Sequence, residues 1–274
     1  MSLAASFFGS PRPRSLSVRL ALVSAGLLLL SCGGQAPVAQ PTGTPQWKLT
    51  FQEEFDGNQL DTAKWSRRYH WGEAVINSEL QAYVDDAFQV SGGMLTIKGE
   101  KRQGQYAGKT MAYTSGVICS EHYQTYGRFE MRCRVPAGKG YWPAFWLLAG
   151  PSTPNVHEVD IFEILGDKPS VLYTTVHWGT DYGTGHQSAG TSITGPDLSA
   201  DFHVYSLEWD ATKLVWSLDG TEVFRHTGGG VPQVPMYIIA NLAIGGGWPG
   251  SPDATTVFPG AFQIDYIRAY QLTD

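Results

Sequence analysis

Polar and apolar side chains alternate along much of this chain. The segment 128–135 (RFEMRCRV) alternates without a break, and the segments 94–98 and 264–270 show the same period of two. Strict alternation is typical of β-strands that bury one face and expose the other. These three segments are therefore predicted to be half-buried strands.

Turn signals separate the alternating runs. Asp219 and Gly220 stand between two apolar runs, and Asp-Gly is preferred in two-residue hairpin turns. Modest helical character is confined to 60–68, where Asp61 is suited to cap a turn or two. Many short strands, 32 glycines and 16 prolines, with no βαβ rhythm and no fixed repeat, predict an all-β sandwich of two antiparallel sheets.

The first 32 residues differ from the rest of the chain. They carry three arginines and no acid, followed by the apolar run 20–30. This pattern predicts a secretory signal at 1–32 whose apolar run is too short for an ordinary transmembrane helix. Residues 33–44, rich in Gly, Pro, Gln and Thr, predict a flexible linker before one domain at 45–274. The protein is expected to be exported.

The end of the predicted signal allows two interpretations. Residues 29–32 (LLSC) resemble the lipobox of bacterial lipoproteins, in which the cysteine, here Cys32, is lipidated and becomes the new N-terminus. Leu30 is not the commonest residue at its position, so plain cleavage near Ser31 is the alternative. The first predicts a cell-envelope lipoprotein attached to the membrane by its lipid anchor only, and the second an extracellular protein.

Net charge limits the expected partners, and the positions of the cysteines leave their redox state open. The net charge of −6 becomes −9 without the three signal arginines, and no basic run is present, so nucleic acid is not an expected partner. Cys119 and Cys133 lie in neighbouring strand-like runs, where a disulfide and two buried thiols are both possible. No heptad or apolar helix pattern indicates an obligate partner, so we expect a monomer.

Three carboxylates are concentrated in the apolar segment 157–166. In an unbroken strand Glu158 and Asp160 share one face and Glu163 lies on the other. A single β-bulge between Asp160 and Glu163 would bring all three to one face, and bulges are enriched next to active sites. The alternative leaves Glu163 in solvent on the back face, as is common on edge strands.

Aromatic residues flank this acidic segment on both sides in the sequence. Trp142 and Trp146 precede it, and His177 and Trp178 follow it; the chain has nine tryptophans in all. Most aromatic residues of an all-β protein fill its core, but carboxylates lined by aromatic rings also suit sugar binding. The combination points to a carbohydrate site.

At these residues the chain resembles a known family. Residues 158–163 (EVDIFE) resemble the E-x-D-x-x-E signature of family 16 glycoside hydrolases, in the form that contains a bulge. Further segments resemble the family in the same order: 51–55, 77–83, 126–130, 142–146, 241–250 and 264–268. The resemblance covers about 47–271, and its Trp-Pro-Ala-x-Trp and Gly-Gly-x-Trp-Pro-Gly segments are most similar to bacterial laminarinases, which are endo-β-1,3-glucanases.

The resemblance implies both a fold and a mechanism. The fold is a β-jelly roll whose concave sheet forms a sugar-binding cleft, and the activity is retaining hydrolysis of a β-glucan polysaccharide without a catalytic cofactor. Glu158 would be the nucleophile, Glu163 the general acid and then base, and Asp160 a helper between them. Such retention needs two carboxyl groups about 5–5.5 Å apart.

Sugar-binding positions are implied in the same way. The six candidates are Trp142, Trp146, His177, Asn77, Asn241 and Trp248. For the tryptophans at 142 and 146 the alternative is a place in the core, for the histidine a structural role, and for the asparagines hydrogen bonds to loop backbone. The tryptophan at 248 stands among glycines, where it has little core to fill.

Many family members bind a structural calcium ion on the convex face. The matching positions are Glu54, the backbone carbonyl of Gly93, and Asp265. Oxygen ligands of this kind suit Ca²⁺. A structural Ca²⁺ is therefore an expectation that comes from the resemblance.

At one position the sequence differs from typical laminarinases, and this difference leaves other substrates possible. Val117 stands where typical laminarinases have an arginine after Thr-Ser-Ala. Loss of a cationic group beside the cleft is compatible with a mixed-linkage β-1,3-1,4-glucanase or a galactan-directed, agarase-like hydrolase. A noncatalytic glucan-binding protein would lack one of the acids, and a transglycosylase cannot be separated from a hydrolase by sequence.

Overall fold

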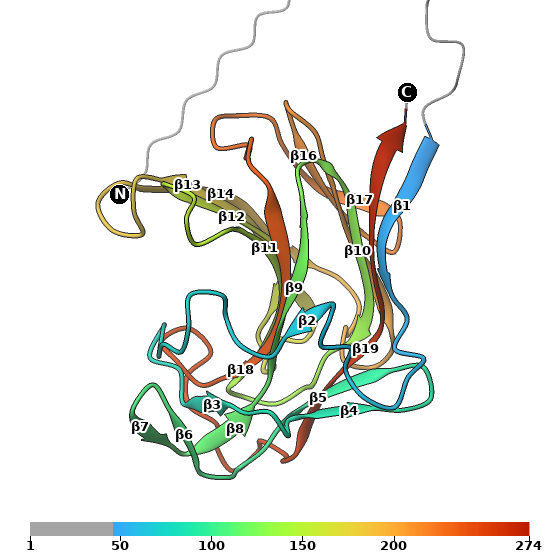
Figure 1. Ribbon diagram of the computed structural model, residues 1–274. Coiled ribbons are helices and arrows are strands. Elements are labelled where there is room, and N and C mark those ends of the chain that lie inside the picture. The colour runs from blue at the N-terminus through green and yellow to red at the C-terminus, as the bar shows by residue number, and fades with distance from the viewer. Residues whose placement is uncertain (1–45, 274) are drawn as a thin grey trace, which may run out of the picture. The chain divides into compact units, whose positions relative to one another are not determined.

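Two β-sheets pack face to face in the computed structural model, which describes residues 46–273 (Figure 1). These residues form nineteen strands and no helix. The eight-stranded sheet has the order β17 (Thr221–His226), β16 (Leu214–Leu218), β15 (His203–Trp209), β10 (Gly127–Arg134), β19 (Gly260–Thr273), β5 (Leu95–Gly99) and β4 (Phe88–Val90), with β1 (Gln46–Glu53) paired to β19. The all-β, antiparallel sandwich predicted from the sequence is confirmed.

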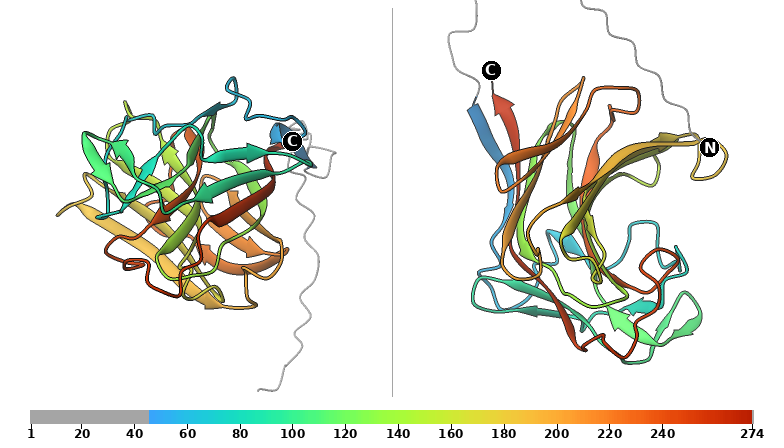
Figure 2. Two further views of the ribbon diagram at one scale, coloured as in Figure 1. Left: turned by 90° about the horizontal axis from the view of Figure 1, so that it is seen from below. Right: turned by 180° about the vertical axis from the view of Figure 1, so that it is seen from behind.

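The second large sheet carries the long strands of the acidic segment. Its order is β14 (His186–Thr194), β13 (Val171–Gly179), β12 (Val156–Ile164), β11 (Tyr141–Ala149), β18 (Met236–Ile244), β9 (Val117–Gln124) and β2 (Trp65–Ser66). Two small pairs complete the fold: β3 (Gln81–Tyr83) runs parallel to β8 (Tyr113–Ser115), and β6 (Gly104–Tyr106) antiparallel to β7 (Lys109–Met111). β1 and β19, from opposite ends of the described chain, lie side by side (Figure 2).

The main core lies between the two large sheets. In β10, Phe129, Met131 and Cys133 are fully buried, and Arg128, Arg132 and Arg134 are partly exposed, as the period of two predicts, whereas Glu130 is also buried. Phe145 of β11 and Phe162 of β12 enter the same core from the other sheet. Every residue of β18 is buried, and β18 is an interior strand of its sheet, paired on both sides with β11 and β9.

Of two local predictions, the hairpin turn is confirmed, and the helical segment is shorter than expected. Asp219 and Gly220 have φ angles of 49° and 78°, as the predicted two-residue hairpin turn between β16 and β17 requires. The expected helical segment 60–68 forms one turn only, where Oδ1 of Asp61 accepts a hydrogen bond from the Ala63 amide at 2.9 Å. The chain then enters β2, because Trp65 is buried and pairs with β9.

The two cysteines of the domain are free thiols. Cys119 lies in β9 and Cys133 in β10, so they belong to different sheets, and both are buried. Burial raises the pKa of each thiol well above its usual value. Of the two alternatives, the structure therefore contains the buried thiols and not the disulfide.

The predicted signal, the linker and Cys32 lie outside the described residues. Within residues 46–273 there is no helix of the length and apolarity that a membrane span requires.

Candidate active site

A β-bulge shapes the acidic strand. Asp160 of β12 pairs with Thr175 of β13, whereas Glu163 pairs with Tyr173, so β12 has one residue more than β13 in this interval. The predicted bulge is confirmed. Ile161 and Phe162, within the bulge, are both buried.

The bulge places the three acids in a single cleft. Glu158, Asp160 and Glu163 all line a cavity of about 910 Å³ on the outer face of the seven-stranded sheet. The alternative, with Glu163 in solvent on the back face, is therefore wrong. Extra residues of this kind re-aim side chains, which is the effect seen here.

Crowding and burial raise the pKa values of these acids. Burial and the charge of Asp160 raise the pKa of Glu158 to about 7, while His177 and a hydrogen bond from Tyr182 act in the opposite direction. Burial also raises the pKa of Asp160. The pKa of Glu163 lies well above its usual value because of burial and then the charges of Asp160 and Glu158. The site therefore favours a mixture of protonated and ionised carboxyl groups near neutral pH.

The two tryptophans of β11 have different surroundings. Trp142 is partly exposed, and its Nε1–H donates to Oε1 of Glu163 at 3.0 Å. Trp146 is largely buried, and its Nε1–H donates to Oδ1 of Asn241 at 2.8 Å. Trp142 thus presents part of its ring to the cleft and orients an acid, whereas Trp146 forms the cleft wall.

The predicted asparagines are already engaged with protein groups. Asn241 is only 6% exposed, and its amide nitrogen donates to the Tyr83 hydroxyl at 3.0 Å. The side chain of Asn77 donates to Oε1 of Glu79 at 3.2 Å, and its backbone carbonyl accepts from the Gly247 amide at 2.9 Å. Both line the cleft. Asn77 also connects the β2–β3 loop to the loop that carries Trp248.

Trp248 is an exposed aromatic wall of the cleft. It is 43% exposed, and its ring packs edge-on against Trp142 and Tyr173, with centroid separations of 5.4 and 4.7 Å. The expectation that this ring does not belong to the core agrees with its exposure. Part of its ring is therefore accessible to a ligand in the cleft.

His177 lies beside the acids, as expected. Its Nε2 is 3.0 Å from Oδ2 of Asp160, and its Nδ1 is 2.9 Å from Nε2 of His186. Neither His186 nor Tyr182 was predicted from the sequence. The Tyr182 hydroxyl donates to Oε2 of Glu158 at 2.5 Å. Tyr182 lies in the turn between β13 and β14, and His186 is the first residue of β14 after that turn. That turn has no periodic pattern, so its sequence alone gave no signal for either residue.

Two further cleft residues were not predicted. Trp71, in the β2–β3 loop, is 37% exposed and stacks on Tyr69 at 4.1 Å between ring centroids. Glu79 is buried, its pKa is raised by burial, and it accepts a hydrogen bond from Gln81 at 2.7 Å. Glu79 belongs to a segment that resembles the family, which is the signal that could have found it.

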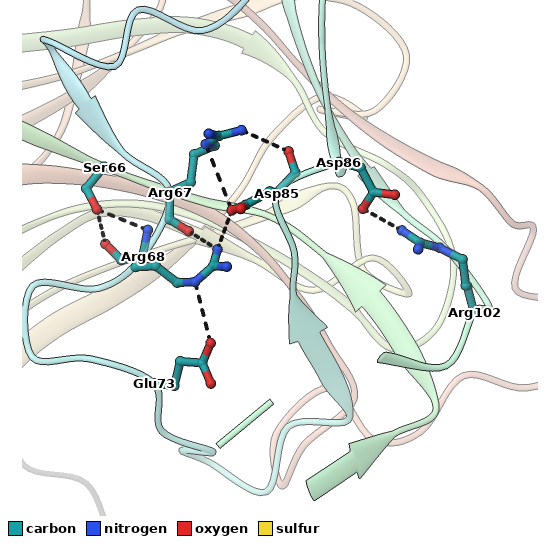
Figure 3. A network of polar contacts seen from close by, with 7 residues as sticks. All are labelled: Ser66, Arg67, Arg68, Glu73, Asp85, Asp86 and Arg102. Carbon is teal, nitrogen blue, oxygen red and sulfur yellow. Dashed lines mark hydrogen bonds and ion pairs between the residues drawn. The ribbon is translucent and has the colours of Figure 1, made fainter. Parts of the chain in front are cut away.

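Ion pairs support the loop that carries Trp71 (Figure 3). Arg68 contacts Oδ1 of Asp85 at 2.7 Å and Oε1 of Glu73 at 3.5 Å. Oε2 of Glu73 accepts from the Ala107 amide at 2.9 Å. The loop is thus tied both to the segment after β3 and to the β6–β7 hairpin.

The carboxylates predicted to bind calcium have other partners. Arg268 forms a bidentate pair with Glu54, at 2.8 Å to each carboxylate oxygen. Arg132 contacts Oδ2 of Asp265 at 2.5 Å. Each carboxylate is therefore neutralised by a guanidinium. These residues, as arranged, do not fit a Ca²⁺ site.

Val117, which replaces the arginine typical of laminarinases, is fully buried. It belongs to a second apolar cluster under the cleft, together with Ala144 and Trp146, and it pairs with Asn241 in β18. Among the described residues that line the cleft there is no lysine or arginine.

Comparisons with known proteins agree with this geometry. The model of "Glycosyl hydrolases family 16" matches residues 76–268. A β-glucanase of Rhodothermus marinus is 34% identical over 253 residues, which cover 83% of this chain and 86% of the relative. The endo-1,3-1,4-β-glycanase EglC of Rhizobium meliloti is also 34% identical, over 81% of this chain and 51% of its own length. The laminarinase catalytic domain of Thermotoga maritima superposes with a TM-score of 0.74 at 34% identity, covering 83% of this chain and 99% of that domain.

Proposed function

Since the chain belongs to glycosyl hydrolase family 16, we propose that it is a retaining endo-hydrolase of β-1,3-glucan. The observation that carries this proposal is the bulge in β12, which brings three carboxyl groups to one face of an aromatic-lined cleft. Catalysis by this family requires no cofactor.

The surroundings of the acids support distinct roles. Glu163 is the general acid, because burial and two neighbouring acids hold its proton and Trp142 orients it. Glu158 is the nucleophile, because His177 and the Tyr182 hydroxyl favour its ionised form against the effect of burial. Asp160 lies between them in the strand and raises the proton affinity of both.

The reaction then follows in two steps. Glu163 gives its proton to the leaving glycosidic oxygen while the Glu158 carboxylate attacks the anomeric carbon, which forms a covalent glycosyl-enzyme. Glu163, now ionised, takes a proton from water, and that water releases the sugar from Glu158. The exposed rings of Trp71 and Trp248 provide surfaces on which the apolar faces of glucose units stack.

Mixed-linkage β-1,3-1,4-glucan is the second candidate substrate. It is favoured by the buried Val117, which supplies no cation to the cleft, and by a relative named as an endo-1,3-1,4-β-glycanase. The two glucans differ in linkage and not in charge. Their discrimination therefore depends on the shape of the cleft.

The test is release of reducing ends from laminarin and from mixed-linkage glucan by the domain 45–274, with Glu158→Gln as the paired control. We expect wild-type activity on laminarin, a loss of at least about 10³-fold in the variant, and a β-configured first product by NMR. Faster hydrolysis of mixed-linkage glucan would select the second candidate. Activity retained in Glu158→Gln would overturn the assignment of the nucleophile.

We further propose that the protein is exported and anchored through lipidated Cys32. The support is the sequence 29–32 and the basic and apolar run before it. The full chain, produced in a bacterium, should enter the detergent phase of a Triton X-114 extract, and Cys32→Ser should move it to the aqueous phase. Aqueous partitioning of both would favour plain cleavage near Ser31.

A further inference from the structure

Two histidines form a relay behind the acids. His177 in β13 and His186 at the start of β14 stack with 5.0 Å between ring centroids and an interplanar angle of 15°. Nδ1 of His177 is 2.9 Å from Nε2 of His186, and Nε2 of His177 is 3.0 Å from Oδ2 of Asp160. Asp160 is only 4% exposed, and that oxygen has no hydrogen-bond partner among the described residues. The imidazole of His177 is thus the polar group poised to satisfy it.

Proton counting limits the state of this relay. If both rings are neutral, Nε2–H of His186 donates to Nδ1 of His177, and Nε2 of His177 keeps its hydrogen. If His177 is an imidazolium, its Nδ1–H donates to His186 and its Nε2–H is again present. If His186 is the imidazolium, its Nε2–H donates to Nδ1 of His177, and Nε2 of His177 again carries its hydrogen. In the remaining arrangement of two neutral rings, Nδ1–H of His177 donates to Nε2 of His186, and the bare Nε2 of His177 then faces an ionised Asp160 with lone pair against lone pair.

We infer that His186 is a positioning residue that keeps a hydrogen on Nε2 of His177, facing Asp160, and so keeps Asp160 ionised. The inference deepens the proposed hydrolase function and rests on it. A partner on the second ring nitrogen commonly fixes the tautomer of a functional histidine. His186 supplies that partner without contacting Asp160 itself.

The turn before His186 is built to hold this position. Oδ1 of Asp181 accepts hydrogen bonds from the amides of Gly183 and Gly185, at 2.6 and 3.3 Å. Gly179, which pairs with His186, has a φ of 133°, and a Cβ there would lie 2.0 Å from the Gly185 carbonyl oxygen. The close approach of the two strands at this turn therefore requires glycine.

Loss of His186 has a defined consequence for the acids. Without its partner, a neutral His177 is free to carry its hydrogen on Nδ1, and the contact with Asp160 then requires a proton on the carboxyl. The charge of Asp160 raises the pKa of both Glu158 and Glu163, so neutral Asp160 lowers both. The groups that face the relay are Asp160, Glu158 and Glu163 of β12 and Asp181 and Tyr182 of the turn.

Two substitutions of His186 distinguish the effect of its flat ring from the effect of its hydrogen-bonding nitrogen. His186→Phe keeps a flat ring but can neither donate nor accept, whereas His186→Gln can do both. We expect His186→Phe to lower kcat at pH 7 at least about tenfold with little change in KM, and to move both limbs of the pH profile to lower pH by about one unit. His186→Gln should stay close to wild type. Equal thermal stability of the variants checks that the fold is intact.

A second readout does not depend on activity. ¹⁵N NMR of the imidazole nitrogens, with His177 assigned by its absence in His177→Asn, should show the Nε2 hydrogen in wild type and His186→Gln but not in His186→Phe. A wild-type tautomer and pH profile in His186→Phe, or equal damage in both variants, would overturn the inference. If wild type hydrolyses no β-glucan, the proposed function fails, and the tautomer still decides the role of His186.

Discussion

Each catalytic carboxyl group has neighbours that stabilise a different protonation state. Glu158 has the Tyr182 hydroxyl and the nearby His177, which favour its charge, whereas Glu163 has the acids on its own strand, which favour its proton. One strand therefore carries two carboxyl groups whose pKa values are both raised, but in surroundings that favour the charge of Glu158 more than that of Glu163. That separation is what retaining hydrolysis needs at a single pH.

Burial of Glu158 is expected to reduce stability at neutral and alkaline pH. Its pKa rises from 4.5 to about 7, so the folded state binds its proton more tightly than the unfolded chain does. This contribution is present below about pH 4.5 and is lost as pH rises through 7. Glu158→Gln should therefore increase the free energy of unfolding by about 1–3 kcal/mol at pH 8 and by much less at pH 4. Urea unfolding at the two pH values measures it, and an equal difference at both would contradict the explanation.

The Tyr182 hydroxyl is expected to set the acidic limb of the activity profile. Its hydrogen bond lowers the pKa of Glu158, so Tyr182→Phe should raise that pKa and move the acidic limb of kcat/KM to higher pH. The loss at pH 5 should be about three- to tenfold. Tyr182 is 60% exposed, and phenylalanine keeps the ring, so the change isolates the hydroxyl. Tyr266→Phe on the other sheet is the control, and an unmoved acidic limb would count against the contact.

At the scale of elements, loops complete the cleft that the strands begin. The strands place the acids, but Trp71 comes from the β2–β3 loop, Tyr182 from the β13–β14 turn and Trp248 from the loop after β18. Exposed ion pairs such as those of Arg68 contribute only about 0–1 kcal/mol each to stability. Their effect is expected in the position of the loop more than in the stability of the fold.

Arg68→Met should therefore weaken substrate binding selectively. Without its contacts to Asp85 and Glu73, the loop that carries Trp71 loses one of its ties (Figure 3). We expect KM for laminarin to rise about two- to fivefold, since one exposed contact is worth up to about 1 kcal/mol, with kcat nearly unchanged. Arg102→Met is the matched control, because Arg102 pairs with Asp86 and Glu100 and not with this loop. Equal increases in KM for both variants would argue against a specific role of Arg68.

The contrast between strands and loops also explains which parts of the structure could be predicted from the sequence. Alternation revealed β10 and β19, Asp219-Gly220 revealed the β16–β17 hairpin, and the spacing of Glu158, Asp160 and Glu163 suggested a bulge that the structure contains. Tyr182 and His186 were missed, because a glycine-rich turn has no period that shows where its side chains point. The parallel β3–β8 pair was also missed, since pairing between distant short strands depends on tertiary contacts.

At the scale of the whole molecule, ion pairs join strands on the eight-stranded sheet. Arg132 of β10 reaches Asp265 of β19, and Arg268 of β19 reaches Glu54, just after β1. The guanidinium of Arg268 also lies 3.8 Å from the centroid of the Tyr266 ring. Hydrogen bonding to Arg268 lowers the pKa of Glu54, so this stabilisation is present above the usual pKa of a glutamate and is lost as pH falls.

These pairs make a direct prediction about calcium. In wild type, Arg268 uses both oxygens of Glu54, so removal of divalent ions with EDTA should leave the melting temperature unchanged. Arg268→Met should lower the free energy of unfolding by about 0.5–1 kcal/mol and free the Glu54 carboxylate to act as an oxygen ligand. Added Ca²⁺ should then stabilise Arg268→Met more than wild type, because a hard cation can replace the lost guanidinium. A melting temperature of wild type that falls with EDTA and recovers with Ca²⁺ would show instead that the ion displaces the arginines and that the predicted calcium site exists.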